Sequence, residues 1–173
     1  GSNGSTPQTS VIISQGSTGN KTYTANWTLG NYTLMKGKDL NAKIKQTANN
    51  NTTATSSTSD STVKSIIFGK YSAYASTVGA WTGGIAVDSN SAGNIRMFLT
   101  NSNANCYILS DGNIDANAES TESGSYNNMF YNFRGVTSFT FNNFNTSNVT
   151  NMSSMFRSCT SLKSLDLSSF NTS

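Results

Sequence analysis

Residues 144–173 read FNTSNVTNMSSMFRSCTSLKSLDLSSFNTS, and the four residues that open this stretch return at its end after 26 positions. The same offset relates earlier residues to this stretch, at identical positions and at positions that stay apolar. The identical pairs are Met129-Phe130 with Met155-Phe156 and Ser138 with Ser164, and the apolar pairs are Phe133 with Cys159, Val136 with Leu162, Phe139 with Leu165 and Phe141 with Leu167. Identity at polar positions together with fixed apolar spacing indicates a true repeat.

The middle of each copy predicts a short strand. The pattern LxxLxL at residues 162–167 is typical of the opening of a leucine-rich repeat, and FTF at residues 139–141 occupies the same place one copy earlier. We expect these strands to stack in parallel, about 4.8 Å apart. The limb that follows is expected to be a short helix whose inner side carries Val149, Met152, Met155, Phe156 and Cys159.

These residues resemble the 26-residue repeat of bacterial surface proteins, the BspA-like leucine-rich-repeat family. The repeat motif covers about residues 129–173, and residues 29–128 are more loosely similar to the domain that often leads into such repeats, through LxxGxxLxxxIK, IFG and YILSDG motifs. The resemblance implies export, surface display, and adhesion or partner binding, and it implies no catalytic residue. Where family members commonly carry Asp in the FDTS turn, this chain has Asn145 and Asn171.

The region before the repeats predicts a β-rich domain with one short helix. Loose alternation over residues 22–35 indicates strand, and Leu40, Ile44 and Ala48 lie on one face of a helix over residues 38–48. Further strands are expected at residues 63–68, 84–87 and 95–100, and a polar surface loop at residues 49–61.

Two local features of that region carry further expectations. Residues 106–110 and 113–116 flank Asp111-Gly112, a turn pair typical of a tight hairpin in which both residues have positive φ. The one local cluster of charge, Lys36, Lys38, Lys43 and Lys45, is expected on the solvent side of the short helix, and an anion site is the alternative.

The expected fold class is therefore mainly β with minor α, in which a β-rich N-terminal domain caps the start of a leucine-rich-repeat-like solenoid. The expected divisions are a flexible tether at residues 1–20, the β-rich domain at residues 21–122, and about two repeats, the second truncated, at residues 123–173.

Composition excludes several chemistries. The 173 residues include no histidine, which removes the usual general base and the commonest transition-metal ligand. Cys106 and Cys159 have no CxxC spacing, so a disulfide between them and two buried free thiols both stay open. The net charge of +3 comes from scattered residues, so nucleic acid is not an expected partner, and no stretch is long and apolar enough to span a membrane. We expect no enzyme activity, no cofactor and no metal site.

The sequence also offers partial matches to a calcium loop, a catalytic carboxylate pair and a sugar-binding platform, each with a simpler explanation. The run from Asp111 to Glu122 has oxygen-bearing side chains at the spacing of an EF-hand loop, but the required glycine is Ala116, and the hairpin explains the run more simply. Paired carboxylates of a glycosidase type have no candidate among the eight acidic residues. A sugar-stacking platform could use Trp27, Trp81, Tyr71 and Tyr74, for which core packing is the alternative.

If the repeats bind a partner, the exposed strand positions Thr140, Asn142, Asp166 and Ser168 are the expected contacts. The function expected from the resemblance is adhesion or recognition by a secreted or surface-displayed scaffold, with a host protein or glycan as partner. The alternative is a structural cap or spacer without a ligand of its own. The apolar end near Leu165, Leu167 and Phe170 is expected to favour end-to-end self-association.

Overall fold

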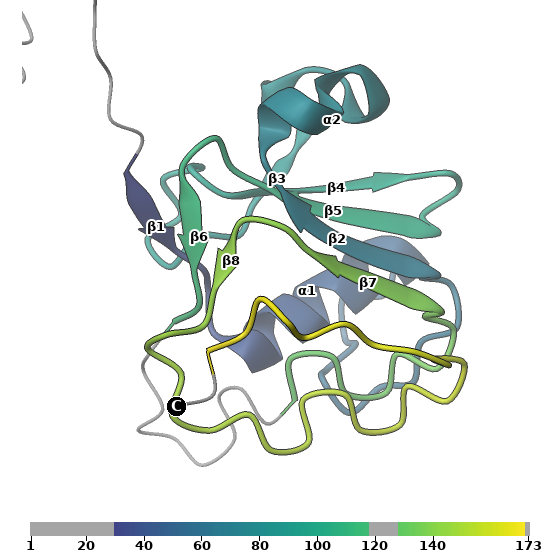
Figure 1. Ribbon diagram of the computed structural model, residues 1–173. Helices are drawn as coiled ribbons and strands as arrows, with labels where there is room; N and C mark the ends of the chain where they lie inside the picture. Colours follow the sequence, from purple (N-terminus) through teal and green to yellow (C-terminus); the bar gives the residue numbers. More distant parts are fainter. Residues whose placement is uncertain (1–29, 118–127, 172–173) are drawn as a thin grey trace, which may run out of the picture.

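The computed structural model describes residues 30–117 and 128–171, which are mainly β with two α-helices (Figure 1). This confirms the expected fold class at the level of secondary structure. The elements are β1 (Asn31–Thr33), α1 (Gly37–Asn49), β2 (Ser65–Gly69), α2 (Tyr71–Val78), the 3-10 turn η1 (Trp81–Gly83), β3 (Ile85–Ala86), β4 (Arg96–Thr100), β5 (Asn105–Leu109), β6 (Asn113–Asp115), β7 (Ser138–Phe141) and β8 (Phe144–Asn145).

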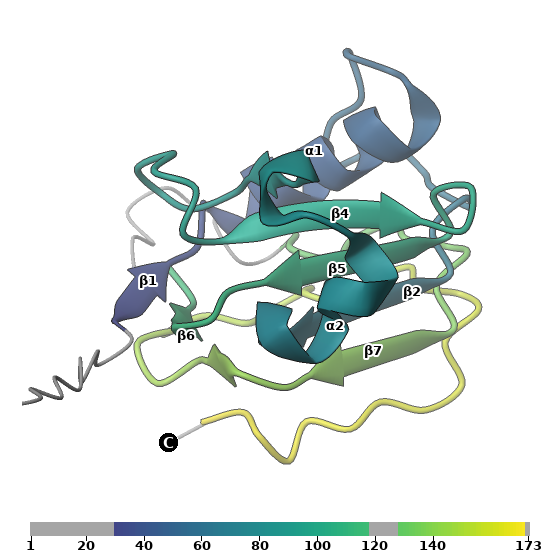
Figure 2. The same ribbon diagram turned by 90° about the horizontal axis from the view of Figure 1, so that it is seen from above.

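A five-stranded sheet in the order β3-β4-β5-β2-β7 forms the centre of the molecule (Figure 2). Neighbours are antiparallel from β3 to β5 and parallel from β5 through β2 to β7. In this register Ile66 of β2 lies between Cys106 and Phe139. The first repeat strand, β7, therefore extends a sheet that the preceding region begins, and the core has residues from both sides of the expected boundary at residue 122.

A second sheet of three parallel strands, β1-β6-β8, lies beside the first. It shows that the hairpin expected at Asp111-Gly112 is wrong, because β5 and β6 belong to different sheets and neither turn residue has positive φ. Glycine is required at residue 112 for another reason: the main chain of Gly30 and the ring of Tyr32 approach it closely. A Cβ at this position would meet the main-chain oxygen of Gly30 and the ring of Tyr32. The observed hairpin joins β4 to β5 through three consecutive residues with positive φ, Asn101, Ser102 and Asn103.

The two helices lie on opposite faces of the five-stranded sheet (Figure 1). In α1 the predicted apolar face is confirmed, with Leu40, Ile44 and Ala48 all buried. The solvent position expected for Lys45 is wrong: its side chain is fully buried, and Nζ donates to the main-chain oxygens of Ser56 and Tyr131. The helix α2 was not expected, and it has no buried residue.

Residues 146–162 form successive turns, so the helix expected in the return limb is wrong. Positive φ at Ser154 and Ser158 interrupts any α-helical run there. The expected inner side is confirmed nonetheless, because Met155 is buried and the other four predicted residues are half-buried against the core. Asn132 and Ser158, which are 26 positions apart, have φ of 62° and 63°, so the two copies share this local backbone conformation.

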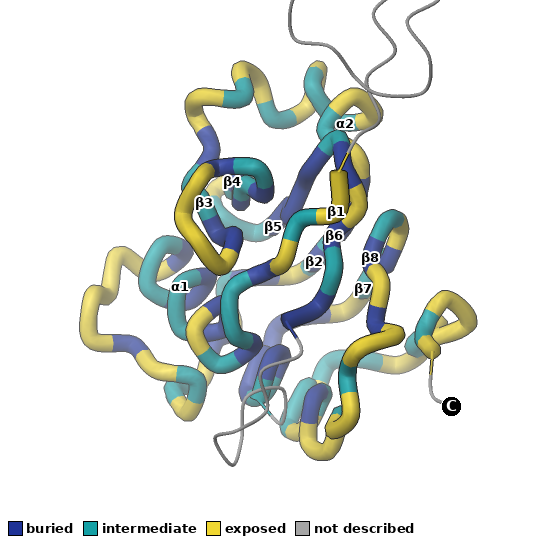
Figure 3. The backbone as a smooth tube through the Cα atoms, turned by 90° about the vertical axis from the view of Figure 1, so that its left-hand side faces the viewer, coloured by how far each residue is buried: buried dark blue, intermediate teal, exposed yellow. Residues whose placement is uncertain are grey.

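The strand prediction is confirmed for the first copy, as β7, and wrong for the second. Residues 162–167 are extended without a strand ladder, and no backbone hydrogen bond within the described residues joins them to β7. Contact between the copies here is through side chains: the rings of Phe141 and Phe170 are 4.8 Å apart, and Ser169 Oγ donates to the oxygen of Phe141 at 3.3 Å. Leu167 is 37% exposed, and the last turns are mostly exposed (Figure 3).

Phenylalanine rings bind the repeats to the rest of the core. The ring of Phe130, fully buried, contacts Phe68 of β2 at 6.2 Å, Phe139 of β7 at 4.8 Å and Phe156 of the second copy at 5.4 Å. None of the helices in the described part of the chain is long and apolar enough to span a bilayer.

Candidate functional site

The five-stranded sheet presents residues in rows to the side that carries α2, which we call the outer face. Along β2, Ile66 and Phe68 point into the main core, so Ser65 and Ile67 point to the outer face. The strand register then decides which residues of the other strands lie beside them.

The first row runs straight across four strands. Phe98 pairs with Tyr107, Tyr107 with Ile67, and Ile67 with Thr140. Phe98 and Tyr107 are buried, whereas Ile67 and Thr140 are half-buried. The row therefore passes from a covered aromatic end to an accessible end at β7.

The second row is polar and lies one pleat away. It consists of Thr100, Asn105, Ser65 and Ser138, and Ser65 Oγ donates to Oδ1 of Asn105 at 3.0 Å. Ser138 is exposed. Short hydroxyl and amide side chains of this kind can donate and accept hydrogen bonds from fixed positions on the sheet.

The helix α2 and the turn η1 cover much of the outer face, and α2 lies in front of β5 and β2 (Figure 2). Tyr74 packs on Tyr107 at 5.4 Å between ring centroids, and Tyr71 packs on Trp81 at 4.9 Å. The Arg96 guanidinium lies 5.6 Å from the centroid of the Trp81 ring. These contacts are those of a small second core, which favours packing over the sugar-stacking alternative; Trp27 lies outside the described residues.

The four predicted contact residues occupy three places. Thr140 lies on the outer face beside Ile67, and Asn142 is exposed in the turn between β7 and β8. Asp166 and Ser168 are exposed on the last described turns, where Asp166 Oδ1 accepts the Ser168 N–H at 2.9 Å. The backbone and side chain of Ser168 lower the pKa of Asp166 by hydrogen bonding to its carboxylate.

Sequence reasoning missed the residues of β2 and β5 on this face. Ser65 and Ile67 lie next to β7 in space but 73 positions before their partners in the chain. Only the alternation within residues 65–69 could have indicated that one side of β2 is open to solvent.

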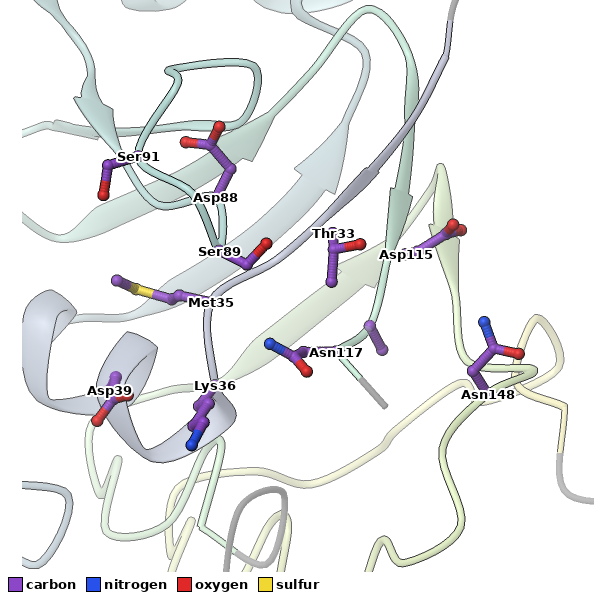
Figure 4. A pocket seen from close by; sticks show the side chains of 11 residues that line it. Thr33, Met35, Lys36, Asp39, Asp88, Ser89, Ser91, Asp115, Asn117 and Asn148 are labelled. Carbon is purple, nitrogen blue, oxygen red and sulfur yellow. The ribbon is translucent and has the colours of Figure 1, made fainter. Parts of the chain in front are cut away.

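A separate cavity of about 650 Å³ lies where β1, α1 and β6 meet (Figure 4). It is lined by Thr33, Met35, Lys36, Asp39, Asp88, Ser89, Ser91, Asp115, Ala116, Asn117 and Asn148. Two of its three carboxylates already hold the fold together: Asp88 accepts the N–H groups of Gly93 and Asn94, and Asp115 accepts from Asn145 Nδ2. Within the described residues, no group of three His, Cys, Asp or Glu side chains is placed to hold a metal ion.

The calcium-like run begins with structural contacts. Asp111 Oδ1 accepts the backbone N–H of Ser72 at the start of α2, and Asn113–Asp115 form β6. Residues of a strand do not wrap around one ion as a calcium loop does. Glu119 and Glu122 lie outside the described residues.

Both thiols are free. Cys106 is fully buried, and burial raises its pKa well above the ordinary value. Cys159 is half-buried, its Sγ lies 3.0 Å from the main-chain oxygen of Phe130, and burial raises its pKa to about 11. Neither has the thiolate character that a reactive cysteine requires.

Residues 110–173 match the model of the family described as Mycoplasma protein of unknown function, DUF285. The matched segment runs from the end of β5 to the end of the chain, well under half of the 173 residues. No curated protein and no solved structure matches the chain.

Proposed function

We propose that this chain is a non-catalytic recognition module of a secreted or surface-displayed bacterial protein. In this proposal the N-terminal β-rich region caps a leucine-rich-repeat-like solenoid, and the outer face near β7 contacts a host protein or glycan. The observation that carries the proposal is the parallel pairing of β7 with β2, because it continues the sheet of one region into the repeats of the other.

The contacts between the two copies support a solenoid. The N–H of Phe130 donates to Met155 at 2.9 Å, and the N–H of Asn132 donates to Arg157 at 3.0 Å. Both bonds join residues about one repeat apart. Stacked repeats stabilise each other through such nearest-neighbour contacts.

A cap is supported by residues 60–64, which contact the first copy in the way that one coil contacts the next. The backbone of Asp60 accepts from Gly135 at 3.1 Å and donates to Asn132 at 2.9 Å. At the other end of this short segment, the Thr137 N–H donates to Lys64 at 2.8 Å. A terminal element of this kind shields the apolar end of a repeat stack from solvent.

The open half of the outer face supports recognition. Ser65, Ser138 and Thr140 place three hydroxyls beside Ile67, which packs on the small second core. The strands that carry them are held by two ladders. A non-catalytic role is supported by the carboxylates of Asp60, Asp88 and Asp115, which each accept hydrogen bonds that hold turns or strands. The patch is small, so we expect weak binding from this chain alone.

The test is binding of the folded chain to an array of host glycans and extracellular matrix proteins. Thr140→Arg places a long charged side chain on the outer face, and Thr53→Arg makes the same change in the exposed loop after α1. A reproducible signal that Thr140→Arg weakens and Thr53→Arg leaves unchanged supports recognition at this face. Equal binding by all three proteins contradicts it.

A cap or spacer without its own ligand is the second candidate, and the contacts of residues 60–64 with the first copy favour it. A blank array from well-folded protein supports this candidate over recognition. End-to-end association of the chain belongs to the same proposal, because Leu167 is the exposed large hydrophobic side chain of the described residues. Light scattering of wild type and Leu167→Lys tests it, and identical monomeric masses contradict it.

A further inference from the structure

Basic side chains gather at one end of the stacked segments. Lys64 precedes β2, Arg134 precedes β7, and Arg157 and Lys163 precede the extended residues 164–167. All four are exposed. The starts of β2 and β7 lie side by side at the right-hand end of the sheet in Figure 1. We call these four residues the basic rim.

Register explains why residues so far apart in sequence meet there. Lys64 lies next to Thr137, which donates its N–H to the main-chain oxygen of Lys64, and Lys163 follows Thr137 by one repeat. The bridge between Asp60 and Phe133 brings Arg134 next to Ser61. The main-chain oxygen of Arg157 accepts the N–H of Asn132, which lies two residues before Arg134. The cations thus come from three successive segments, and the ladder between β2 and β7 spaces the first two about 5 Å apart.

Two carboxylates of the described residues, Asp60 and Asp166, lie on the same stacked segments as the four cations of the rim. Asp60 is 1% exposed and accepts from the Val63 N–H and from Asn49 Nδ2. Asp166, three positions after Lys163, is exposed and accepts the Ser168 N–H. Lys64 Nζ donates to the Ser61 oxygen at 2.6 Å, which leaves its positive charge uncompensated. Four exposed cations against one exposed carboxylate leave an excess of positive charge, which favours an anionic partner.

We propose that the basic rim binds a linear anionic polysaccharide, a polymer whose sulfate or carboxylate groups recur along its length. Hydroxyl groups lie among the cations at Ser61, Thr137 and Thr160, where they can donate to sugar and sulfate oxygens. A row of cations from separate segments matches a polymer of regularly spaced anions better than it matches one compact ion. The rim adjoins the outer face, because Lys64 and Thr137 directly precede Ser65 and Ser138. Its charges are present whether or not the outer face binds a partner, so this proposal does not rest on the function proposed above.

The surroundings of Tyr131 favour a polysaccharide over a single-stranded nucleic acid. Nucleic-acid surfaces of this kind combine cations with open aromatic rings on which bases stack. Tyr131 is the aromatic residue beside the rim, and the Arg157 guanidinium already lies 5.9 Å from the centroid of its ring. The main-chain oxygen of Tyr131 accepts a hydrogen bond from Lys45, which fixes the backbone of this residue.

The test is binding of the whole chain to four probes by calorimetry at low and physiological salt: dextran sulfate, hyaluronan, uncharged dextran and single-stranded poly(dT). The variant Arg134→Glu/Arg157→Glu reverses two charges of the rim. Its matched control, Lys36→Glu/Lys70→Glu, makes the same change in net charge at residues before α1 and α2, away from the rim. Circular dichroism and thermal melts establish that all three proteins fold.

We expect dextran sulfate, hyaluronan or both to bind, and added salt to weaken binding because it screens exposed charges. The rim variant should lose binding by about tenfold or more, since it places like charges against the polymer, and the control should change by less than about threefold. Binding to dextran sulfate alone assigns the site to sulfate, and binding to hyaluronan shows that carboxylate suffices. Three results overturn the proposal: no binding to either anionic polymer, an equal loss in the control variant, or tighter binding of poly(dT) than of both polysaccharides.

Discussion

Lys45 Nζ in α1 donates a hydrogen bond of 2.7 Å to the main-chain oxygen of Tyr131, 86 positions later in the chain. The same oxygen accepts from Asn41 Nδ2 at 3.0 Å, one helical turn earlier. The ammonium group also lies 4.7 Å from the centroid of the Phe133 ring. One buried cation thus joins the first helix to the loop that opens the repeats.

The unfolding free energy at alkaline pH should depend on the ionisation of Lys45. Burial lowers the pKa of the Lys45 ammonium from 10.5 to about 8, against an opposing effect of Asp60. Between these two values the unfolded chain holds a proton that the folded chain has released, so raising the pH favours the folded state. The unfolding free energy of wild type should therefore rise relative to that of Lys45→Met, by on the order of 1–3 kcal/mol from pH 8 to pH 10.5. Urea titrations at several pH values measure it, and a constant difference between the two proteins contradicts it.

Gly135→Ala should destabilise the junction between the two regions. A Cβ at Gly135 would meet the main chain of Ser61, which cannot move without breaking the neighbouring hydrogen bonds of Asp60. We expect a loss of about 1–3 kcal/mol, seen as a melting temperature lower by roughly 2–4 °C per kcal/mol. Gly83→Ala is the matched control, because a Cβ there meets nothing within 4 Å. Equal melting temperatures for the two variants would show that the close approach is not tight in solution.

Phe130→Ala should be among the most damaging substitutions in the core. Its ring is fully buried and packs on aromatic rings from β2, β7 and the second copy. Removing it leaves a cavity and costs about 3–5 kcal/mol of unfolding free energy. Leu167→Ala, at a side chain that is 37% exposed, should change stability by about 0.5 kcal/mol or less. Chemical denaturation measures the unfolding free energy of both variants. Similarly small decreases in both would mean that the repeats pack loosely on the sheet.

Thiol labelling should separate the two cysteines from each other and from free cysteine. At pH 8 the raised pKa of Cys159 leaves little thiolate, so its reaction with a disulfide reagent should be on the order of a hundredfold slower than that of free cysteine. Cys106, fully buried in β5, should react only when the chain unfolds. The absorbance of the released thiolate follows both reactions, with urea-unfolded protein as the control. Fast labelling of Cys106 in native protein would contradict its burial.

Local pattern was enough to predict the elements whose contacts are set by periodicity. The face of α1 follows from the spacing of Leu40, Ile44 and Ala48, and the strands β2, β4 and β5 follow from apolar runs between polar turns. The burial of Lys45 was not predicted, because a charged residue is rarely buried. Its hydrogen-bond partners are main-chain oxygens, whose positions the sequence pattern does not indicate.

Long-range contacts decided the features that were wrong. Asp111-Gly112 is a good hairpin pair, but β6 pairs with β1 and β8 instead of with β5, so the turn became a corner between two sheets. In the return limb, the apolar spacing indicated the inner side correctly, while positive φ at serine residues replaced the helix by turns. The outer face was predicted only at Thr140, because its neighbours come from a strand 73 positions away.

The register of β2 has a consequence for the order of events during synthesis. This strand needs β5 on one side and β7 on the other, and its two ladders close loops of 40 and 73 residues. Pairings between residues this far apart in the chain form slowly. The ladder between β2 and β7 also cannot be completed until Phe141 has left the ribosome. A nascent chain that has reached only residue 117 exposes one edge of β2 and the apolar surface that Phe130 and Phe141 later cover. The first repeat therefore completes the main core that the preceding residues begin.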